Sequence, residues 1–442
     1  MSISDSGLIT WMPDSVGTYG PIIVSVYDGG EDGASPAVQE LLIEVQYLYT
    51  VANYDLYEGN NLISFYSIPP ESDDVDFVFD SIESSVTNIF GEGSFAQYNP
   101  NFGWIGSLQQ VSPEDGYWVR MSEDSPFNVY GLPIGIVEYE VHSGANLLSY
   151  PYDFSQDLQA ALPDDVEDKI YAIFGQNISA LNINGMWLGS LSSFEPGKGY
   201  WYIANEPFVF EYNTLAGSSF SRNYIENPPI EIDYYQSTQQ AFYFIEELSL
   251  NHYNIDQGDW IVAYNGDTVV GSRMWNGSYT DIPVMGYDSG IQDGGIGVDL
   301  NTQGYCKLGD VPTFKIYKPL TGEFVNLEGE NIPSWSSNNV FVVSSLEDEQ
   351  FPMELSLHSA YPNPFNPSTT INYEIPFGSF HVNLSVYDLR GRLVEVLVDQ
   401  VQSSKVDPYS IVWNANDMSS GVYFIRLHAG DSIKTQKVML VK

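Results

Sequence analysis

The chain has 442 residues, too many for one hydrophobic core, so several domains are expected. It carries 58 Asp and Glu against 15 Lys and Arg, for a net charge of -43, and so acidic a surface has no basic patch to neutralise phosphates, which excludes nucleic-acid binding. The single cysteine, Cys306, excludes an internal disulfide and a cysteine-based zinc site.

Short segments of alternating polarity dominate the chain, and Gly, Asn, Asp and Pro bound them. Together with 14% aromatic residues, this pattern predicts a mainly β protein built of serial β-sandwich-like modules. Two stretches, residues 74–86 and 157–174, instead predict a short helix each. No apolar run approaches the ~20 residues that span a bilayer, and no signal peptide is visible at the N-terminus.

Residues 1–48 predict the first unit. A "GLITWMP" segment is followed by two alternating strands and an intervening "DGG", and together they resemble the last strands of a cadherin-like or immunoglobulin-like domain. Only about half of such a domain is present, and three strands with an open edge are marginal alone. We therefore favour a natural start upstream of Met1 over a hairpin docked on the next module. The strands carry these apolar residues: Ile22, Val24 and Val26, then Leu41, Ile43 and Val45.

The segment "DGGEDG" in this unit has the spacing of the first half of a calcium loop. Asp28 and Asp32 are the candidate oxygen ligands, but Gln39 stands where such a loop places its bidentate Glu. Asp288 and Asp293 form a second, less complete pattern. The alternative for both segments is a solvated turn rich in Asp and Gly. No other cofactor is indicated.

Residues 49–134 and 135–213 predict a tandem repeat of a module of about 80 residues. "GNNLISFYSIP" returns as "GANLLSYPYDF", "WIGSL" as "WLGSL" and "PEDGYW" as "PGKGYW". We expect the recurring tryptophans to pack in cores, with platforms for stacking sugars as the alternative. The repeat resembles the "GWNLISLP…GYW" modules of large secreted proteins of certain Gram-negative bacteria, a resemblance that implies no chemistry. The tryptophans are Trp104, Trp118, Trp187 and Trp201.

Residues 214–348 predict a further β-sandwich module. Alternation on both sides of Asn265 and Gly266 predicts a hairpin. The segment resembles the "DWIGAFNGD…VGAR.W" module that often precedes the last domain of the same secreted proteins. Trp260 and Trp275 are the aromatic residues through which such a module could bind polysaccharide.

Residues 349–442 predict a linker and a small antiparallel sandwich of six or seven strands. Its prolines cannot donate to a ladder and should hold the entry segment extended outside the sheet. "YPNPFNP", "VYDLRGR", "GVYFIRL" and a lysine-containing last strand resemble the type A C-terminal sorting domain of the type IX secretion system. The motif residues are Tyr361, Pro362, Asn363, Pro364, Gly391, Gly421, Tyr423, Lys434 and Lys437.

This resemblance implies a Gram-negative protein that crosses the outer membrane. Its partners would be the type IX translocon, which recognises the domain, and a sortase-like protease. Cleavage is expected within the linker, between Ser345 and Ala360, because exposed linkers admit proteases. The cargo would then be released or attached to surface lipopolysaccharide.

No catalytic constellation accompanies these modules. The five histidines are scattered, and "HExxH", a nucleophile elbow and a phosphate loop are all absent. We therefore expect a non-catalytic, multi-domain segment of a secreted or surface protein with an adhesion or spacer role. The alternative is an accessory carbohydrate-binding region of a secreted hydrolase whose catalytic domain lies upstream of Met1. An enzyme within residues 214–348 is a third reading.

Overall fold

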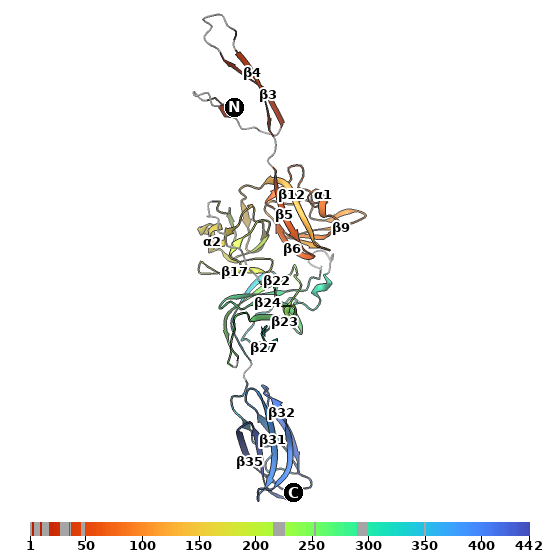
Figure 1. The fold of residues 1–442 in the computed structure, drawn as a ribbon, viewed down its shortest axis with the longest axis vertical. Helices are drawn as coiled ribbons and strands as arrows, with labels where there is room; N and C mark the ends of the chain where they lie inside the picture. Colours follow the sequence, from red (N-terminus) through yellow and green to blue (C-terminus); the bar gives the residue numbers. More distant parts are fainter. Residues whose placement is uncertain are drawn as a thin grey trace.

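The computed structural model describes residues 2–3, 9–10, 17–26, 35, 37–45, 49–214, 226–251, 253–289, 299–348 and 351–442. It is mainly β, as predicted, and is elongated, with an N-terminal hairpin at one end and the C-terminal sandwich at the other (Figure 1). In the described part of the chain, no helix is long and apolar enough to cross a membrane.

The N-terminal hairpin pairs β3 (Gly17–Val26) with β4 (Ala37–Val45), next to the short pair β1 (Ser2–Ile3) and β2 (Ile9–Thr10). Five of its large apolar side chains are exposed, so these strands do not bury an apolar face against the next module. The five are Ile23, Val38, Leu41, Leu42 and Ile43.

The first repeat, residues 49–134, contains a five-stranded antiparallel sheet in the order β10-β9-β8-β11-β6 and a second sheet in the order β5-β12-β7. Its strands are β5 (Thr50–Leu56), β6 (Gly59–Ser64), β7 (Ser67–Ile68), β8 (Val86–Gly91), β9 (Ser94–Asn99), β10 (Gly103–Gly106), β11 (Gly116–Met121) and β12 (Ser125–Pro133).

The second repeat has a five-stranded sheet in the order β14-β20-β16-β17-β18, with the pairs β13-β21 and β15-β19 beside it. In the five-stranded sheet of each repeat, the first strand along the chain pairs with the fifth, and the fifth also pairs with the second. The strands of the second repeat are β13 (Tyr139–Val141), β14 (Gly144–Leu148), β15 (Gln156–Asp157), β16 (Ile170–Gly175), β17 (Ile178–Ile183), β18 (Met186–Gly189), β19 (Ser193–Phe194), β20 (Tyr200–Ala204) and β21 (Phe208–Phe210).

Each repeat carries helical turns where the sequence predicts a helix. They are α1 (Val75–Val78) and η1 (Asp80–Ile82) in the first repeat, and α2 (Leu158–Ala161) and α3 (Asp164–Glu167) in the second. The second prediction is wrong at its end, because residues from Ile170 onward form strand β16. The β-branched and aromatic residues of "IYAIF" favour a strand over a helix.

The recurring motifs divide their side chains between two cores, because neighbours on a strand point to opposite faces. In "GYW" of the first repeat, Tyr117 points into the repeat's own core and Trp118 into a cluster shared by three modules. In the second repeat, Tyr200 and Trp201 divide in the same way. Packing therefore accounts for the recurring tryptophans, as expected, and Trp104 and Trp187 pack against the core of their own repeat.

The strands of the third module form one seven-stranded sheet, ordered β24-β23-β26-β27-β28-β22-β25, in which β22 and β28 are parallel. Its outer strands meet at Gly271, where a Cβ atom would lie 1.6 Å from the Pro283 carbonyl oxygen, so only glycine lets the sheet close on itself. The strands are β22 (Gln240–Ser249), β23 (Trp260–Asn265), β24 (Thr268–Met274), β25 (Thr280–Met285), β26 (Thr313–Lys318), β27 (Glu323–Glu328) and β28 (Asn339–Asp348).

The C-terminal sandwich has one sheet ordered β29-β30-β33 and another ordered β32-β31-β34-β35. The alternating apolar side chains of this domain, among them Ile371 and Leu384, are fully buried between the sheets. Its strands are β29 (Ser356–Leu357), β30 (Ser368–Glu374), β31 (Ser379–Asp388), β32 (Leu393–Ser403), β33 (Tyr409–Asn414), β34 (Gly421–Ala429) and β35 (Ser432–Leu440).

Candidate functional site

The two repeats contact each other reciprocally. Ser64 N donates to the Gly197 carbonyl oxygen at 3.1 Å, and the residue at the matching place in the second repeat, Ser149, donates to the Glu114 carbonyl oxygen at 2.9 Å. A contact made twice with the roles exchanged is what an isologous interface contains.

A second reciprocal pair involves the turns after β8 and β16. Leu62 N donates to Gln176 Oε1 at 2.9 Å, and Leu147 N donates to Glu92 Oε2 at 2.8 Å. The two repeats therefore hold each other through main-chain amides that donate to main-chain and side-chain oxygens of the other copy.

The first repeat is joined to the third module through Arg120. Its guanidinium forms an ion pair with Asp288 and donates from Nε to Asn60 Oδ1 at 2.9 Å. Asp288 also accepts from Thr238 Oγ1 at 2.8 Å, and Asp299 lies 3.9 Å from Arg120 Nε. Only 10% of the Arg120 side chain and 2% of the Asp288 side chain are exposed, so each charge depends on the other for compensation.

The second repeat is joined to the third module through Asp281. Its Oδ2 accepts from Ser179 Oγ at 2.8 Å and from Ser190 Oγ at 2.6 Å, and lies 3.5 Å from Arg273 Nη2. Arg273 also donates to the Asn177 carbonyl oxygen at 2.6 Å. Burial raises the pKa of the Asp281 carboxyl, and Arg273 with the two serine hydroxyls opposes that rise.

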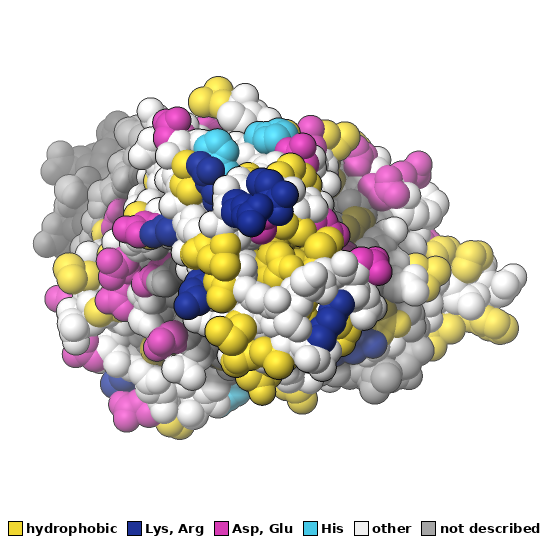
Figure 2. Space-filling model, turned by 90° about the horizontal axis from the view of Figure 1, so that it is seen from below, with side chains coloured by type: hydrophobic (Ala, Val, Ile, Leu, Met, Phe, Trp, Pro, Cys, Tyr) yellow, Lys and Arg dark blue, Asp and Glu magenta, His cyan; other side chains and the backbone are white. Residues whose placement is uncertain are grey.

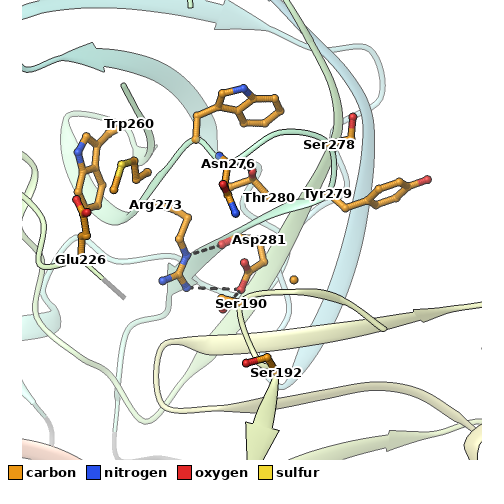
Figure 3. A pocket seen from close by; sticks show the side chains of 13 residues that line it. Ser190, Ser192, Glu226, Trp260, Arg273, Asn276, Ser278, Tyr279, Thr280 and Asp281 are labelled. Atoms are coloured by element: carbon orange, nitrogen blue, oxygen red, sulfur yellow. Dashed lines mark hydrogen bonds and ion pairs between the residues drawn. The ribbon is translucent and has the colours of Figure 1, made fainter. Parts of the chain in front are cut away.

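A cavity of about 430 Å³ lies beside this ion pair, between β18 and β24–β25. Figure 3 shows Arg273 and Asp281 at its centre, with Trp260 beside Glu226 at one side. Trp260 is only 5% exposed, so the expectation of an exposed, sugar-stacking Trp260 is wrong. It packs with Ile232 and Tyr317, because the turn η2 (Ile230–Ile232) covers that face of β23.

The structure offers no support for a metal site in the residues it describes. They contain no group of three or more His, Cys, Asp and Glu side chains that could hold an ion. Asp288 is committed to Arg120, whereas Asp28, Asp32 and Asp293 lie outside the described residues, so the calcium hypothesis for them remains a prediction. The acidic pair Asp256 and Asp259 binds the Lys318 ammonium group, at 3.0 and 2.7 Å.

Two of the sorting motifs, "YPNPFNP" and "YDLRGR", lie at one end of the C-terminal sandwich. Phe365 N donates to the Met439 carbonyl oxygen at 2.9 Å, and Asn363 Oδ1 accepts from Met439 N at 2.9 Å. The "YPNPFNP" segment thus lies outside the named strands, as its prolines predict, yet it is bonded to the last strand, β35. The expectation that the prolines keep this segment outside the sheet agrees with the named strands, but the segment also forms isolated bridges, Tyr361 with Thr370 and Phe365 with Leu440.

The "YDLRGR" turn reaches the same end, because Asp388 pairs with Tyr423 and Gly421 pairs with Leu440. Asp388 accepts from Arg390 N and Arg392 N at 2.9 Å each. These amides and the Arg392 side chain lower the pKa of the Asp388 carboxyl. We define the sorting tip as residues 361–367, 388–392, 414–421 and 440–442.

The sorting tip faces away from the rest of the protein. At the other end of the sandwich, Phe377 contacts Tyr253 and Phe351, with ring centroids 5.3 Å apart in each pair. Figure 2 shows Lys and Arg side chains beside apolar ones at the free end. The large apolar side chains Tyr361 and Leu389 are 81% and 69% exposed there.

The remaining predicted motif residues divide by role. Tyr423 is 8% exposed and Gly421 half-buried, so they belong to the packed domain. Gly391 has a φ of 74°, which the tight turn requires. The exposed motif residues are Pro362, Asn363, Pro364, Lys434 and Lys437. The two lysines lie on β35 outside the sorting tip, where Lys437 pairs with Phe424 and Lys434 with Leu427.

Charge separates this domain from the rest of the chain. Residues 359–442 hold seven of the 15 Lys and Arg and seven of the 58 Asp and Glu, so the whole net charge of -43 lies before them. A neutral domain behind an acidic cargo can be distinguished electrostatically by a partner.

The comparisons agree with this division. Residues 359–442 match the family described as "Secretion system C-terminal sorting domain". With two of its motifs at one tip, this match makes the tail a sorting domain, which marks the protein for export to the cell surface or the extracellular space. No curated protein matches the sequence.

Two solved structures show a weak likeness to this chain. A crystal structure of dimeric latent PorU from Porphyromonas gingivalis is 12% identical with a TM-score of 0.16, and the match covers 76% of this chain and 36% of that one. A structure of the first eight immunoglobulin domains of Down Syndrome Cell Adhesion Molecule is 9% identical with a TM-score of 0.15, and covers 97% of this chain and 58% of that one.

Proposed function

We propose that this chain is cargo of a type IX secretion system, recognised through the sorting tip and then displayed on, or released from, the cell surface. The observation that supports this most is the coincidence of the family match with two motifs at one exposed end. We propose the outer-membrane translocon and a sortase-like protease as its partners.

The export proposal is tested with a passenger. Residues 351–442 have a core of their own, so they should carry an inert, signal-bearing protein out of a host that has the machinery. The matched control is the same fusion without residues 432–442, which include β35, the strand that anchors the "YPNPFNP" segment. Immunoblots of the medium and cell fractions give the readout, and retention of the intact fusion in the periplasm would contradict the proposal.

We propose that the protease cuts between Asp348 and Leu355, which narrows the cleavage window. Ser345–Asp348 belong to β28, where Ser345 pairs with Glu247, and Leu355 is 3% exposed in the sorting-domain core. Between them, Met353 is 80% exposed, and a protease needs such accessible backbone.

Mass spectrometry of the mature surface protein should therefore find a C-terminus within residues 348–354, and intact chains in a strain that lacks the protease. A mature protein that retains Lys442, or a cut inside β28, would contradict the prediction.

For the cargo, we propose a non-catalytic adhesion or spacer role. The reciprocal repeat contacts and the buried pairs at Arg120 and Asp281 join residues 49–348 into one body, which would hold the N-terminal hairpin away from the anchor. The alternative is an accessory carbohydrate-binding region of a secreted hydrolase. Trp260 does not support it, because this side chain is buried and offers no exposed ring for a sugar to stack on.

A further inference from the structure

The cavity of about 430 Å³ beside the Arg273–Asp281 pair has one hydrogen-bonding edge that the protein leaves free. Arg273 Nε donates to the Asp281 carbonyl oxygen at 2.9 Å, and Nη2 donates to the Asn177 carbonyl oxygen at 2.6 Å. Nη1, which carries two N–H groups, has no hydrogen bond with any residue that the structure describes. Figure 3 shows this edge of the guanidinium turned away from Asp281, toward the side of the cavity where Trp260 and Glu226 lie.

This free edge belongs to a buried side chain. Only 8% of the Arg273 side chain is exposed, so bulk solvent does not surround it as it surrounds an arginine on the surface. A buried charged group needs hydrogen-bond partners for its N–H groups, and those that the protein does not supply must come from what fills the cavity. Nη1 therefore indicates a ligand with acceptor atoms, or water that such a ligand displaces.

A turn in a strained conformation forms another part of the lining. Tyr279 has a φ of 62°, in the left-handed region that a bulky side chain rarely adopts, and such residues concentrate at functional sites. Tyr279 N donates to the Ile245 carbonyl oxygen at 2.7 Å, and Thr280 Oγ1 accepts from Asn276 N at 3.1 Å. These bonds fix the turn, whose exposed residues Asn276 and Ser278 line the cavity.

The charges on the cavity favour a neutral ligand. The guanidinium is matched by Asp281, whose Oδ2 lies 3.5 Å from Nη2, so no unmatched positive charge is available to hold an anion. The exposed Glu226 carboxylate also lines the cavity and repels an anion. A cation is disfavoured in turn, because the free edge of Arg273 is itself positive and can only donate.

The lining also suits a ring that carries hydroxyl groups. Trp275 is half-buried, and it packs against the core of the third module and also lines the cavity, as does Met274. Apolar surfaces of this kind pack against the C–H face of a sugar ring. The Asn276 amide both donates and accepts, so it can bind a hydroxyl group. The volume of the cavity lies within the range of small-molecule sites.

We propose that this cavity binds one sugar unit of an uncharged saccharide, with Arg273 Nη1 and the Asn276 amide bound to its hydroxyl groups and the Trp275 ring packed against its C–H face. The site goes beyond export and display. It can fail while the sorting domain works, because the passenger test contains none of these residues. It also gives a use to the junction between the second repeat and the third module, since Ser190 and Ser192 of the repeat line the same cavity.

The test uses the full-length chain, labelled with ¹⁵N at its tryptophan indoles and titrated with the methyl glycosides of glucose, galactose, mannose and xylose and with cello- and xylo-oligosaccharides. Galacturonate and glucosamine are the charged comparisons. At least one neutral sugar should bind saturably and shift the Trp275 indole resonance.

Two variants address the polar contacts, with calorimetry as the readout. Arg273→Lys keeps a cation beside Asp281 but lacks the Nη1 edge, so it should lower the affinity at least tenfold. Asn276→Ala removes one hydrogen-bonding group from an exposed side chain and should lower the affinity about fivefold. Thermal unfolding shows whether each variant is folded, and Asn276→Ala decides the case if Arg273→Lys does not fold.

Asn254→Ala is the matched control, because Asn254 is an exposed asparagine of the same module that does not line this cavity. It should bind the sugar like the parent chain. The proposal is overturned if none of the neutral sugars binds, if a charged sugar binds more tightly, or if Asn276→Ala binds as well as the parent chain. It is also overturned if Asn254→Ala weakens binding as much as Asn276→Ala.

Discussion

Replacing Arg120 by methionine should lower the free energy of unfolding of the joint body, residues 49–348, by about 3–5 kcal/mol. The change leaves Asp288, whose side chain is 2% exposed, and the nearby Asp299 without their cation. A carboxylate that loses its partner in a position excluded from solvent cannot be compensated by water instead. Urea unfolding followed by tryptophan fluorescence measures the effect, because Trp118 and Trp201 lie at the same junction.

Two further variants make this result specific. Arg392→Met removes an exposed arginine from Asp388 (72% of the Arg392 side chain is exposed) and should cost less than about 1 kcal/mol. Asp288→Asn added to Arg120→Met removes the unpaired charge and keeps an acceptor for Thr238, so it should restore part of the loss. If the Arg120→Met variant has the same free energy of unfolding as the parent chain, the Arg120–Asp288 ion pair does not stabilise the contact between the first repeat and the third module.

Placing charges on the sorting tip should stop export without unfolding the domain. In the variant Tyr361→Asp/Leu389→Asp, both side chains are exposed at the tip, so the core keeps its packing, whereas a partner that recognises the apolar tip must bury two carboxylates. We expect the secreted amount to fall at least tenfold, with folded protein accumulating in the periplasm.

Val401→Asp is the matched control for this variant. Val401 is 68% exposed on β32, opposite His381, at the other end of the same domain. Fractionation and immunoblotting measure export, and thermal unfolding checks the fold. Normal export of the tip variant, or equal retention of Val401→Asp, would show that recognition lies elsewhere.

The sorting domain could be predicted because its information is local. The alternation of apolar and polar residues in "TTINYEI" puts Ile371 and Tyr373 on one face of β30, and both are fully buried. Turn residues such as Gly391 are recognisable within a few positions. Each module's own core follows the same rule, since Tyr117 and Tyr200 of the recurring "GYW" point inward.

The junctions could not be predicted from one sequence, because their contacts join distant positions. Arg120 and Asp288 are 168 residues apart, and no sequence pattern around either residue indicates that the two form an ion pair. The sequence nevertheless contained one indication of these junctions. The segments "NLIS" and "GYWVRM" lack the polar–apolar alternation of a strand with one solvent-exposed face, and their strands, β6 and β11, are buried at every position. Such runs indicate two covered faces, and the outer face of these sheets is covered by other modules.

The reciprocal packing of the repeats has a consequence for how such a protein can specialise. Two identical subunits related by a dyad must change together, since one gene encodes both. Fused copies are released from that symmetry. At the place where the first copy has Arg120, the second has Ile203, so one half carries a charge that the other lacks. Covalent linkage thus lets the two copies form an asymmetric pair that fits a single neighbouring module.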